Sequence, residues 1–279
     1  MSVPSNSRCL VTGASNPTSI GYAAAQALLD AGAGHVTIMG RDKVKVDATV
    51  ASLKNMSKGQ VSGVVGDLKK PETMAAVVQE SVGIMGGLDI LVISGGNGYS
   101  EYLGLDPQDP ASYRMMHDVG VLSPLFLTEA AVPELAKSTA GPGTVVMVSS
   151  VAPLVPWPDT APFNYAKAAQ NTMTETLAFK YRTGNVRING VLPACIHTGA
   201  LDVMAAKKKA NIDEYAKLRA DAHPMARNGT PQDVANAVVF LASPASGFTT
   251  GELLKVDGGL HLSNWFNKPK LLAEFVGGL

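Results

Sequence analysis

The stretch CLVTGASNPTSIGYAAAQALLDAG, residues 9–32, joins a short apolar run to an alanine-rich run. The first run predicts a buried strand and the second predicts a helix. Between them, Gly13 permits a tight turn and Gly21 permits close approach of the helix. The free N–H groups that open such a helix suit a pyrophosphate, although an ordinary strand-to-helix turn is the alternative, because the loop lacks a middle glycine. The other residues of this predicted phosphate site are Ser15, Thr18, Ser19 and Ile20.

Apolar runs of this kind alternate with helical patterns along the rest of the chain. Six more runs indicate strands: HVTIMG, VSGVVG, LDILVIS, TVVMVSS, VRINGVL and LLKVDGG. Strands that are apolar on both faces and alternate with helices predict a parallel sheet covered on both sides. We therefore predict a single-domain α/β fold with a doubly wound, Rossmann-type sheet. Ligands of such sheets bind beyond the carboxyl ends of the strands, so residues there are the functional candidates.

Composition excludes several classes of function. Lysine plus arginine and aspartate plus glutamate number 23 each in 279 residues, so no global field favours nucleic acid or an anionic membrane. Cys9 and Cys195 lack metal-ligand spacing, and we expect no metal. The start MSVPSNSR lacks the apolar segment of a signal peptide, and no apolar run is long enough to span a bilayer. A cytoplasmic protein acting on a small molecule is the expectation.

Charged residues after the second and third predicted strands bear on the choice of nucleotide. Arg41 ends the second strand, where an adenosine ribose would lie. An arginine suits a 2′-phosphate, whereas an acid would bind the 2′-hydroxyl, so NADP(H) is predicted over NAD(H). Asp42 follows and could restore some NAD(H) binding. Asp67, after the third strand, is predicted to meet the adenine edge, to cap the helix that begins near KKPETMAAVV, or both.

The chain resembles the short-chain dehydrogenase/reductase family from about Arg8 to Leu262. The most specific stretch is GTPQDVANAVVFLASPASGFTTGELLKVDGG, supported by TGASNPTSIG, LDILVISGG, VVMVSSVA, the lysine of PFNYAKAA and RINGVLP. The resemblance implies an NADP-binding domain over residues 1–262 and a homodimer or homotetramer. The apolar extension at 263–279 is expected to pack on its own or a neighbouring subunit. Further cofactor-binding residues implied by the resemblance are Leu68, Gly95, Gly96, Lys167, Ile196 and Thr198.

The family's usual catalytic set is an asparagine, a serine, and a tyrosine four residues before a lysine. Ser150 and Lys167 match the serine and the lysine, but the tyrosine position, thirteen residues after the serine, holds Phe163. The asparagine position falls on Gly120. Tyr165 is excluded, because aligning it with the family tyrosine would put an alanine at the lysine position. In a helix, Phe163 shares a face with Lys167, whereas residues two apart point about 200° away from each other.

Phenylalanine has no exchangeable proton, and losing a positioned general acid typically costs about 10²- to 10⁴-fold in rate. Ordinary ketone reduction is therefore expected to be impaired. The leading hypothesis is an NADP(H)-dependent reductase of specialised metabolism whose acceptor is an iminium, an imine or a conjugated alkene. Hydride converts an iminium to a neutral amine without a general acid, and a conjugated alkene can take its proton later from solvent. A second is a non-redox cyclase, isomerase or lyase that keeps the nucleotide as a structural element. A third is a pseudoenzyme that binds nucleotide and a protein partner.

Other side chains are candidates for the substrate pocket, together with Gly120 and Phe163. Trp157 and Asp159 lie in the proline-rich loop PLVPWPDTAP and could offer an aromatic wall and a carboxylate, or simply pack locally. His197, in PACIHTG, is a candidate replacement acid or a solvent-facing loop residue. The long segment with Tyr215 and His223 is expected to cover the substrate.

Overall fold

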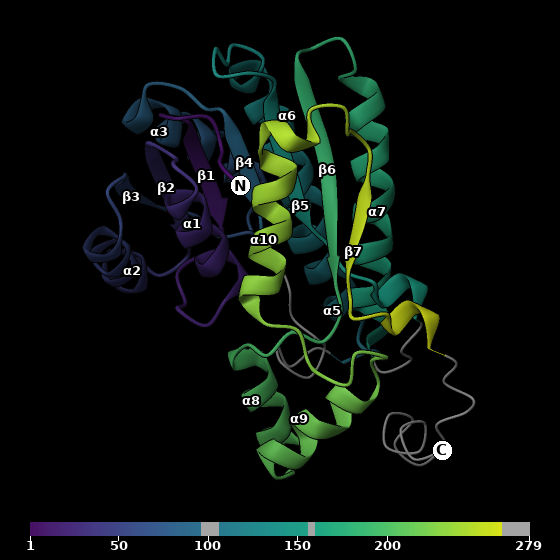
Figure 1. The fold of residues 1–279 in the computed structure, drawn as a ribbon. Helices are drawn as coiled ribbons and strands as arrows, with labels where there is room; N and C mark the ends of the chain where they lie inside the picture. Colours follow the sequence, from purple (N-terminus) through teal and green to yellow (C-terminus); the bar gives the residue numbers. More distant parts are fainter. Residues whose placement is uncertain (96–105, 156–159, 264–279) are drawn as a thin grey trace.

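The computed structural model describes residues 1–95, 106–155 and 160–263 (Figure 1). In this part of the chain, seven strands form one parallel sheet in the order β3-β2-β1-β4-β5-β6-β7. The strands are β1 (Arg8–Thr12), β2 (His35–Gly40), β3 (Gln60–Val65), β4 (Ile90–Ile93), β5 (Gly143–Val148), β6 (Val186–Pro193) and β7 (Leu253–Val256). The predicted doubly wound, Rossmann-type sheet is confirmed, and its order reverses between β1 and β4, where such sheets bind ligands.

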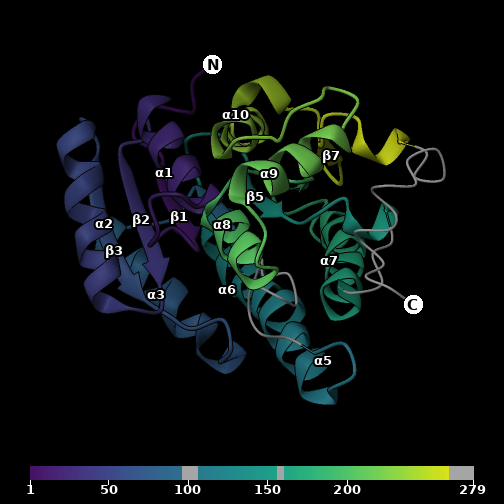
Figure 2. The same ribbon diagram turned by 90° about the horizontal axis from the view of Figure 1, so that it is seen from below.

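Helices cover both faces of the sheet (Figures 1 and 2). Helices on one face are α1 (Ile20–Asp30), α2 (Lys43–Met56) and α10 (Pro231–Ala242). Helices on the other are α3 (Met74–Met85), α6 (Ser123–Leu135) and α7 (Ala161–Lys180). Helix α5 (Pro110–His117) runs through a π-helical turn, η2 (Asp118–Leu122), into α6. Short 3₁₀ turns are η1 (Pro71–Thr73), η3 (Ala152–Leu154), η5 (Pro244–Ser246) and η6 (Leu260–Leu262).

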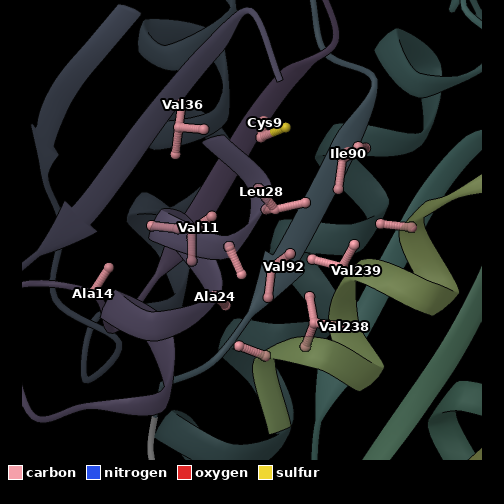
Figure 3. Packing of buried hydrophobic residues seen from close by; sticks show 14 of the residues in the cluster. Cys9, Val11, Ala14, Ala24, Leu28, Val36, Ile90, Val92, Val238 and Val239 are labelled. Carbon is pink, nitrogen blue, oxygen red and sulfur yellow. The ribbon is translucent and has the colours of Figure 1, made fainter. Parts of the chain in front are cut away.

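Each face of the sheet has its own apolar core. Cys9 and Val11 of β1 belong to the core beneath α1 and α10, while Leu10 belongs to the opposite one. Figure 3 shows the first core, where Val238 and Val239 of α10 approach Val92 of β4. Successive residues of a strand point to opposite faces, so a strand with two covered faces must be apolar throughout. This is why β1 reads as an uninterrupted apolar run.

Two helices lie beyond the carboxyl edge of the sheet. They are α8 (Gly199–Lys207) and α9 (Ile212–Asp221), which follow β6 and appear below the sheet in Figure 1. Thr198 caps α8 by accepting a hydrogen bond from the Ala200 N–H, and Asn211 caps α9 in the same way. Because ligands of parallel sheets bind at this edge, α8 and α9 cover the expected site.

The buried guanidinium group of Arg187 connects β6 by hydrogen bonds to β5 and to the segments between α10 and β7. Arg187 of β6 is 8% exposed and donates hydrogen bonds to groups of β5, of the end of α10 and of the chain entering β7. The acceptors are the hydroxyls of Thr144 and Ser246 and the carbonyls of Leu241, Ser243 and Thr249, at 3.0–3.4 Å. Burial lowers the pKa of Arg187. These bonds compensate the desolvation of the cation.

We expect Arg187→Ala to lower the free energy of unfolding by about 3 kcal/mol, because several buried carbonyls would lose their donor. Arg182→Ala is the matched control: Arg182 is exposed, and its contacts among the described residues are with the carbonyl and the ring of the nearby Phe179. The control is expected to change stability by less than about 0.5 kcal/mol. Urea unfolding of both variants tests this, and equal midpoints would contradict it.

Candidate cofactor and active site

A cavity of about 310 Å³ lies at the switch between β1 and β4. The structure places most of the predicted cofactor-binding residues in its wall. These are Gly13, Ser15, Thr18, Ser19, Ile20, Arg41, Asp67, Leu68, Gly95 and Thr198. Gly96, also predicted, lies outside the described residues. Wall residues that the sequence did not nominate include Asn16, Lys69, Ser94 and Val119.

Two glycines shape the phosphate end of this cavity. Gly13 has φ +64°, and a β-carbon there would lie 2.0 Å from the Ser94 carbonyl oxygen. A β-carbon on Gly21 would lie 2.6 Å from the Gly13 carbonyl oxygen. Ser19 caps α1, donating to the Gly13 carbonyl and accepting from the Tyr22 N–H, both at 3.1 Å. A side chain at either glycine would overlap the neighbouring backbone, so both positions require glycine. This close approach brings the N-terminus of α1 to the cavity, which fits the phosphates of a dinucleotide.

Further polar contacts join this loop to the rest of the cavity. The Thr18 hydroxyl accepts a hydrogen bond from the Gly199 N–H at 3.2 Å, which connects the loop to the start of α8. Ser94 lines the cavity, and its hydroxyl is buried without a hydrogen-bond partner among the described residues. A buried orphan hydroxyl is costly, and a bound polar ligand would satisfy it. This second observation also fits the predicted nucleotide.

Charges around the adenosine end favour a phosphate. Arg41 and Lys69 line the cavity, whereas Asp42 does not. The Asp42 carboxylate instead caps α2 by accepting a hydrogen bond from the Lys45 N–H at 3.2 Å. The Asp42 carboxylate, which could have bound a ribose 2′-hydroxyl, is therefore hydrogen-bonded to the start of α2, while the cations of Arg41 and Lys69 line the cavity.

Asp67 lines the same cavity, but its expected role as a helix cap is corrected. Its carboxylate accepts a hydrogen bond from the Lys69 N–H at 3.0 Å, and its backbone carbonyl closes a turn at 67–70 by accepting from the Lys70 N–H at 2.8 Å. Helix α3 starts only at Met74, preceded by Thr73 and the 3₁₀ turn η1. Pro71 starts this extra turn, so the helix begins too late for Asp67 to reach its N–H groups.

A second cavity of about 80 Å³ adjoins the first and shares Ile20, Thr198 and Ala200 with it. Ser150, Phe163 and the predicted cofactor residue Ile196 line it. Most of its wall is apolar. Among the described residues that line it, Arg219 is the one with a charged side chain. The position beside the cofactor cavity makes it the candidate reaction pocket.

Ser150 presents a hydroxyl to this pocket. The oxygen accepts a hydrogen bond from the Ala152 N–H at 3.0 Å, and the hydroxyl points toward the Pro193 carbonyl at 3.5 Å. The side chain is 7% exposed. Because its O–H contact is long, a substrate acceptor that approaches Ser150 would compete well for this proton.

The two aromatic residues of PFNYAKAA lie on different sides of α7. Phe163 is 4% exposed, packs with Met116, Ala152 and Ala166, and has its ring centroid 5.9 Å from the Lys167 Nζ. Tyr165 is 64% exposed, and its ring lies 5.9 Å from that of Tyr113. The ring that lines the pocket beside the lysine is thus hydrocarbon, and the phenol two residues later faces away from the pocket.

Lys167 is completely buried, yet it lines neither cavity. Its Nζ donates to the Val148 carbonyl at 3.0 Å and to the side-chain oxygen of Gln170 at 2.7 Å. Burial lowers the pKa of Lys167 to about 7. The predicted contact of this amino group with a ribose therefore requires it to move from the position seen here.

The absence of a side chain at Gly120 lets two helical segments touch. Gly120 is buried in the π-helical turn η2, and a β-carbon there would lie 2.9 Å from the Ala166 β-carbon of α7. An asparagine would not fit without displacement of α7. The position where the family resemblance expects an asparagine is thus a contact between η2 and α7. Gly120 lines neither cavity.

The remaining sequence candidates are not brought together with Ser150. His197 lines neither cavity, its side chain is 53% exposed, and its Nε2 lies 4.0 Å from an Asp202 oxygen. Trp157 and Asp159 lie outside the described residues. His223 is buried, with its Nδ1 2.9 Å from the Arg219 carbonyl, and burial lowers its pKa.

Arg219 is the pocket residue that sequence analysis missed. It belongs to α9, is 3% exposed, and its guanidinium lies 5.3 Å from the ring of Tyr215. Its charge also acts on the pocket residue Cys195, lowering that thiol's pKa, although burial, the larger effect, raises it. No local pattern identifies such a residue, because the inward face of α9 depends on how α8 and α9 dock.

The low pKa of Lys167 predicts a pH-dependent stability. Between its folded value of about 7 and the unfolded value near 10, the unfolded chain binds a proton that the folded chain does not. Stability from this group therefore rises as pH increases from 7 to 10. We expect the free energy of unfolding of Lys167→Met, relative to that of wild type, to be higher at pH 7 than at pH 10. Urea unfolding at both pH values measures this difference. A pH-independent difference would contradict the buried, weakly basic amine.

Comparisons with known proteins agree with this geometry. A family model described as Enoyl-(Acyl carrier protein) reductase matches residues 13–261. Human "Dehydrogenase/reductase SDR family member 4" is 33% identical over 258 residues, covering 91% of this chain and 87% of the relative. The glucose 1-dehydrogenase of Gluconobacter oxydans (strain 621H) is 32% identical, with 92% and 95% covered.

Solved structures give the same result. L-sorbose reductase from Gluconobacter frateurii, complexed with NADPH and L-sorbose, superposes with a TM-score of 0.84 at 26% identity, covering 94% of this chain and 99% of that one. An NADPH-bound short-chain oxidoreductase from Pseudomonas aeruginosa PAO1, described as containing an atypical catalytic center, gives 0.83 at 26% identity, covering 93% and 98%. The chain belongs to the short-chain dehydrogenase/reductase family of oxidoreductases.

Proposed function

We propose that the protein is an NADP(H)-dependent reductase whose substrate is a small molecule with an iminium, imine or conjugated acceptor. The observation that carries this is the hydrocarbon ring of Phe163, buried in the pocket wall next to Ser150 and Lys167, with Tyr165 turned to the surface. A site with a nucleotide cavity but no phenol suits hydride transfer to an iminium, which becomes a neutral amine without a proton. It also suits a conjugated acceptor, whose enolate takes its proton later from solvent.

The preference for NADP(H) is supported by the charges that line the cofactor cavity. Arg41 and Lys69 face the place expected for a 2′-phosphate, and Asp42 is occupied at the start of α2. Cations of this kind make strong charge-assisted hydrogen bonds to phosphate oxygens. Two of the solved relatives are described as NADPH complexes.

Each residue then has a definite task. The Gly13–Gly21 loop and the N-terminus of α1 bind the pyrophosphate, and Arg41 binds the adenosine phosphate. Ser150 donates a hydrogen bond that orients the acceptor, and Phe163 excludes water from the reacting face. The bound nucleotide supplies hydride. Lys167 is assigned to the nicotinamide ribose, as in the family at large.

The positive charge of Arg219 in the pocket wall limits which of the proposed acceptors can bind there. A positive charge in a largely apolar pocket opposes the entry of a bare cation. Two kinds of substrate satisfy both Phe163 and Arg219. One is an iminium that also bears an anionic group, and the other is a conjugated carbonyl compound that becomes an enolate as hydride arrives. In the second, the guanidinium stabilises the developing charge.

The wider setting is part of the same proposal. We place the enzyme in specialised metabolism, in the cytoplasm, as a homodimer or homotetramer. Support for subunit pairing comes from a shallow, mostly apolar groove on α6 and α7. Its lining residues are Leu125, Ala168, Ala169, Thr172, Met173, Thr176 and Leu177. No helix in the described part of the chain is long and apolar enough to cross a membrane.

The second candidate is a non-redox cyclase, isomerase or lyase. The same hydrocarbon wall favours it, because an enclosed apolar pocket can hold one reactive molecule in a productive shape without a proton donor. The nucleotide would then remain unconsumed.

Arg41→Ala is expected to weaken NADPH binding about 10-fold, because the variant loses a charge-assisted hydrogen bond to the 2′-phosphate. NADH binding should stay within about twofold, since NADH lacks that phosphate. The control is Lys43→Ala, because Lys43 is exposed, pairs with Asp47 and does not line the cavity. Fluorescence titration of both nucleotides measures the effect. Equal losses for NADPH and NADH would contradict the assignment.

The reaction itself is tested by single-turnover mixing of enzyme, NADPH and a cyclic imine or a conjugated carbonyl compound, with and without a carboxylate. Loss of NADPH absorbance together with product supports the reductase, and product without that loss supports the non-redox candidate. Phe163→Tyr should leave imine reduction within about threefold while raising ketone reduction at least about 10-fold, because it adds a proton donor. If wild type already reduces plain ketones as fast as imines, the proposal fails.

A further inference from the structure

Helix α7 buries a row of residues against the sheet that changes from apolar to polar. Phe163, Lys167, Gln170 and Thr174 recur at spacings of four, three and four, so they lie on one helix face. Lys167, Gln170 and Thr174 are each 0% exposed, whereas Leu177 and Ala178 beyond them join the apolar core. Packing against the sheet favours apolar side chains on this face of α7, so packing alone does not explain an amide at position 170.

The amide of Gln170 makes one strong bond and leaves one group unsatisfied. Its oxygen accepts from the Lys167 Nζ at 2.7 Å, while its nitrogen is buried with no hydrogen-bond partner in the described structure. A buried unsatisfied donor is destabilising, and an apolar side chain of similar volume would avoid that cost. The contact with Lys167 is what the glutamine provides.

That contact holds the amino group away from both cavities. One N–H of Lys167 is directed to Gln170 and another to the Val148 carbonyl of β5, and neither cavity includes Lys167 in its wall. Burial lowers the pKa of Lys167, and among the described residues its amino group forms no ion pair with a carboxylate. The neutral oxygen of Gln170 and the Val148 carbonyl are thus the acceptors that set its position.

We propose that Gln170 is a positioning residue that keeps the Lys167 amino group in an inward resting position and competes with the nicotinamide ribose for it. The inference rests on the proposed function, in which Lys167 binds that ribose. Occupation of the ribose site breaks the hydrogen bond between Lys167 and Gln170. The strength of this bond then sets how tightly the nucleotide binds.

Two substitutions at this position have opposite expected effects on NADPH binding. Gln170→Met keeps the length of the side chain but removes the acceptor, so the resting position is weakened and NADPH should bind about 10-fold tighter. Gln170→Glu places a carboxylate against the amine, so the resting position is strengthened and NADPH should bind about 10-fold more weakly. Fluorescence titration at pH 7 measures both dissociation constants.

Thr174→Val is the matched control. Thr174 is buried on the same face of α7 and bonds the Gln170 carbonyl and the Met147 sulfur, but it has no contact with Lys167. The control should lose stability without a change in NADPH affinity beyond about twofold. In a Lys167→Met background, Gln170→Met should no longer change NADPH affinity, because the group through which it acts is gone.

The pH profile gives a readout that damage to the fold would not reproduce. A carboxylate beside Lys167 raises its pKa, so the stability gain with rising pH should begin at a higher pH in Gln170→Glu than in wild type. Shifts of NADPH affinity in the same direction for both variants, or an effect of Gln170→Met that survives in the Lys167→Met background, would overturn the proposal while leaving the reductase assignment intact. Wild-type protein that binds neither NADPH nor NADH would overturn both.

Discussion

The close approach of two loops at the centre of the sheet is the constraint on which the site depends. Gly13 follows β1 and the Ser94 carbonyl follows β4, and no β-carbon can stand between them. Because β1 and β4 are neighbours whose connections leave toward opposite faces, the loops part beyond this contact and the cofactor cavity opens there. Gly21 then lets α1 begin against Gly13, which aims its N-terminus at the same space.

The candidate reaction pocket is lined mainly by apolar residues, with Ser150 and Arg219 among its polar groups. Along α7, the ring before the lysine is hydrocarbon and the residue after it is a buried amide. On this face of α7, Lys167 therefore lies between the hydrocarbon ring of Phe163 and the amide of Gln170. Burial lowers the pKa of Lys167, and two carbonyl oxygens accept hydrogen bonds from its amino group. The side chain can therefore stay in the protein interior.

Helices α8 and α9 supply part of the wall of this pocket. Leu201 and Met204 contribute apolar wall, while Arg219 adds a positive charge at the same place. In the proposed function, the apolar wall selects the substrate by shape and the charge of Arg219 opposes a bare cation. The charge in the pocket wall thus comes from the second helix of the cover, about seventy residues after Ser150 in the chain.

Local sequence determined the sheet, the phosphate loop and the register of α7. Uninterrupted apolar runs identify strands buried on both faces, Gly13 and Gly21 identify positions without room for a side chain, and a spacing of four places Phe163 beside Lys167. These features depend on neighbours in the chain. Asp67 was only half predictable, because η1 delays α3 and leaves the carboxylate in a turn.

Only the tertiary structure decided where Arg219 points, that His197 faces outward, and that Lys167 bonds Gln170 inside the core. The physical reason is common to all three. Hydrophobic periodicity records whether a position is buried, but the partner of a buried polar group is set by packing between segments distant in sequence. Helix α9 packs against α8, and α7 packs against β6, which brings Lys167 to the Val148 carbonyl at the end of β5.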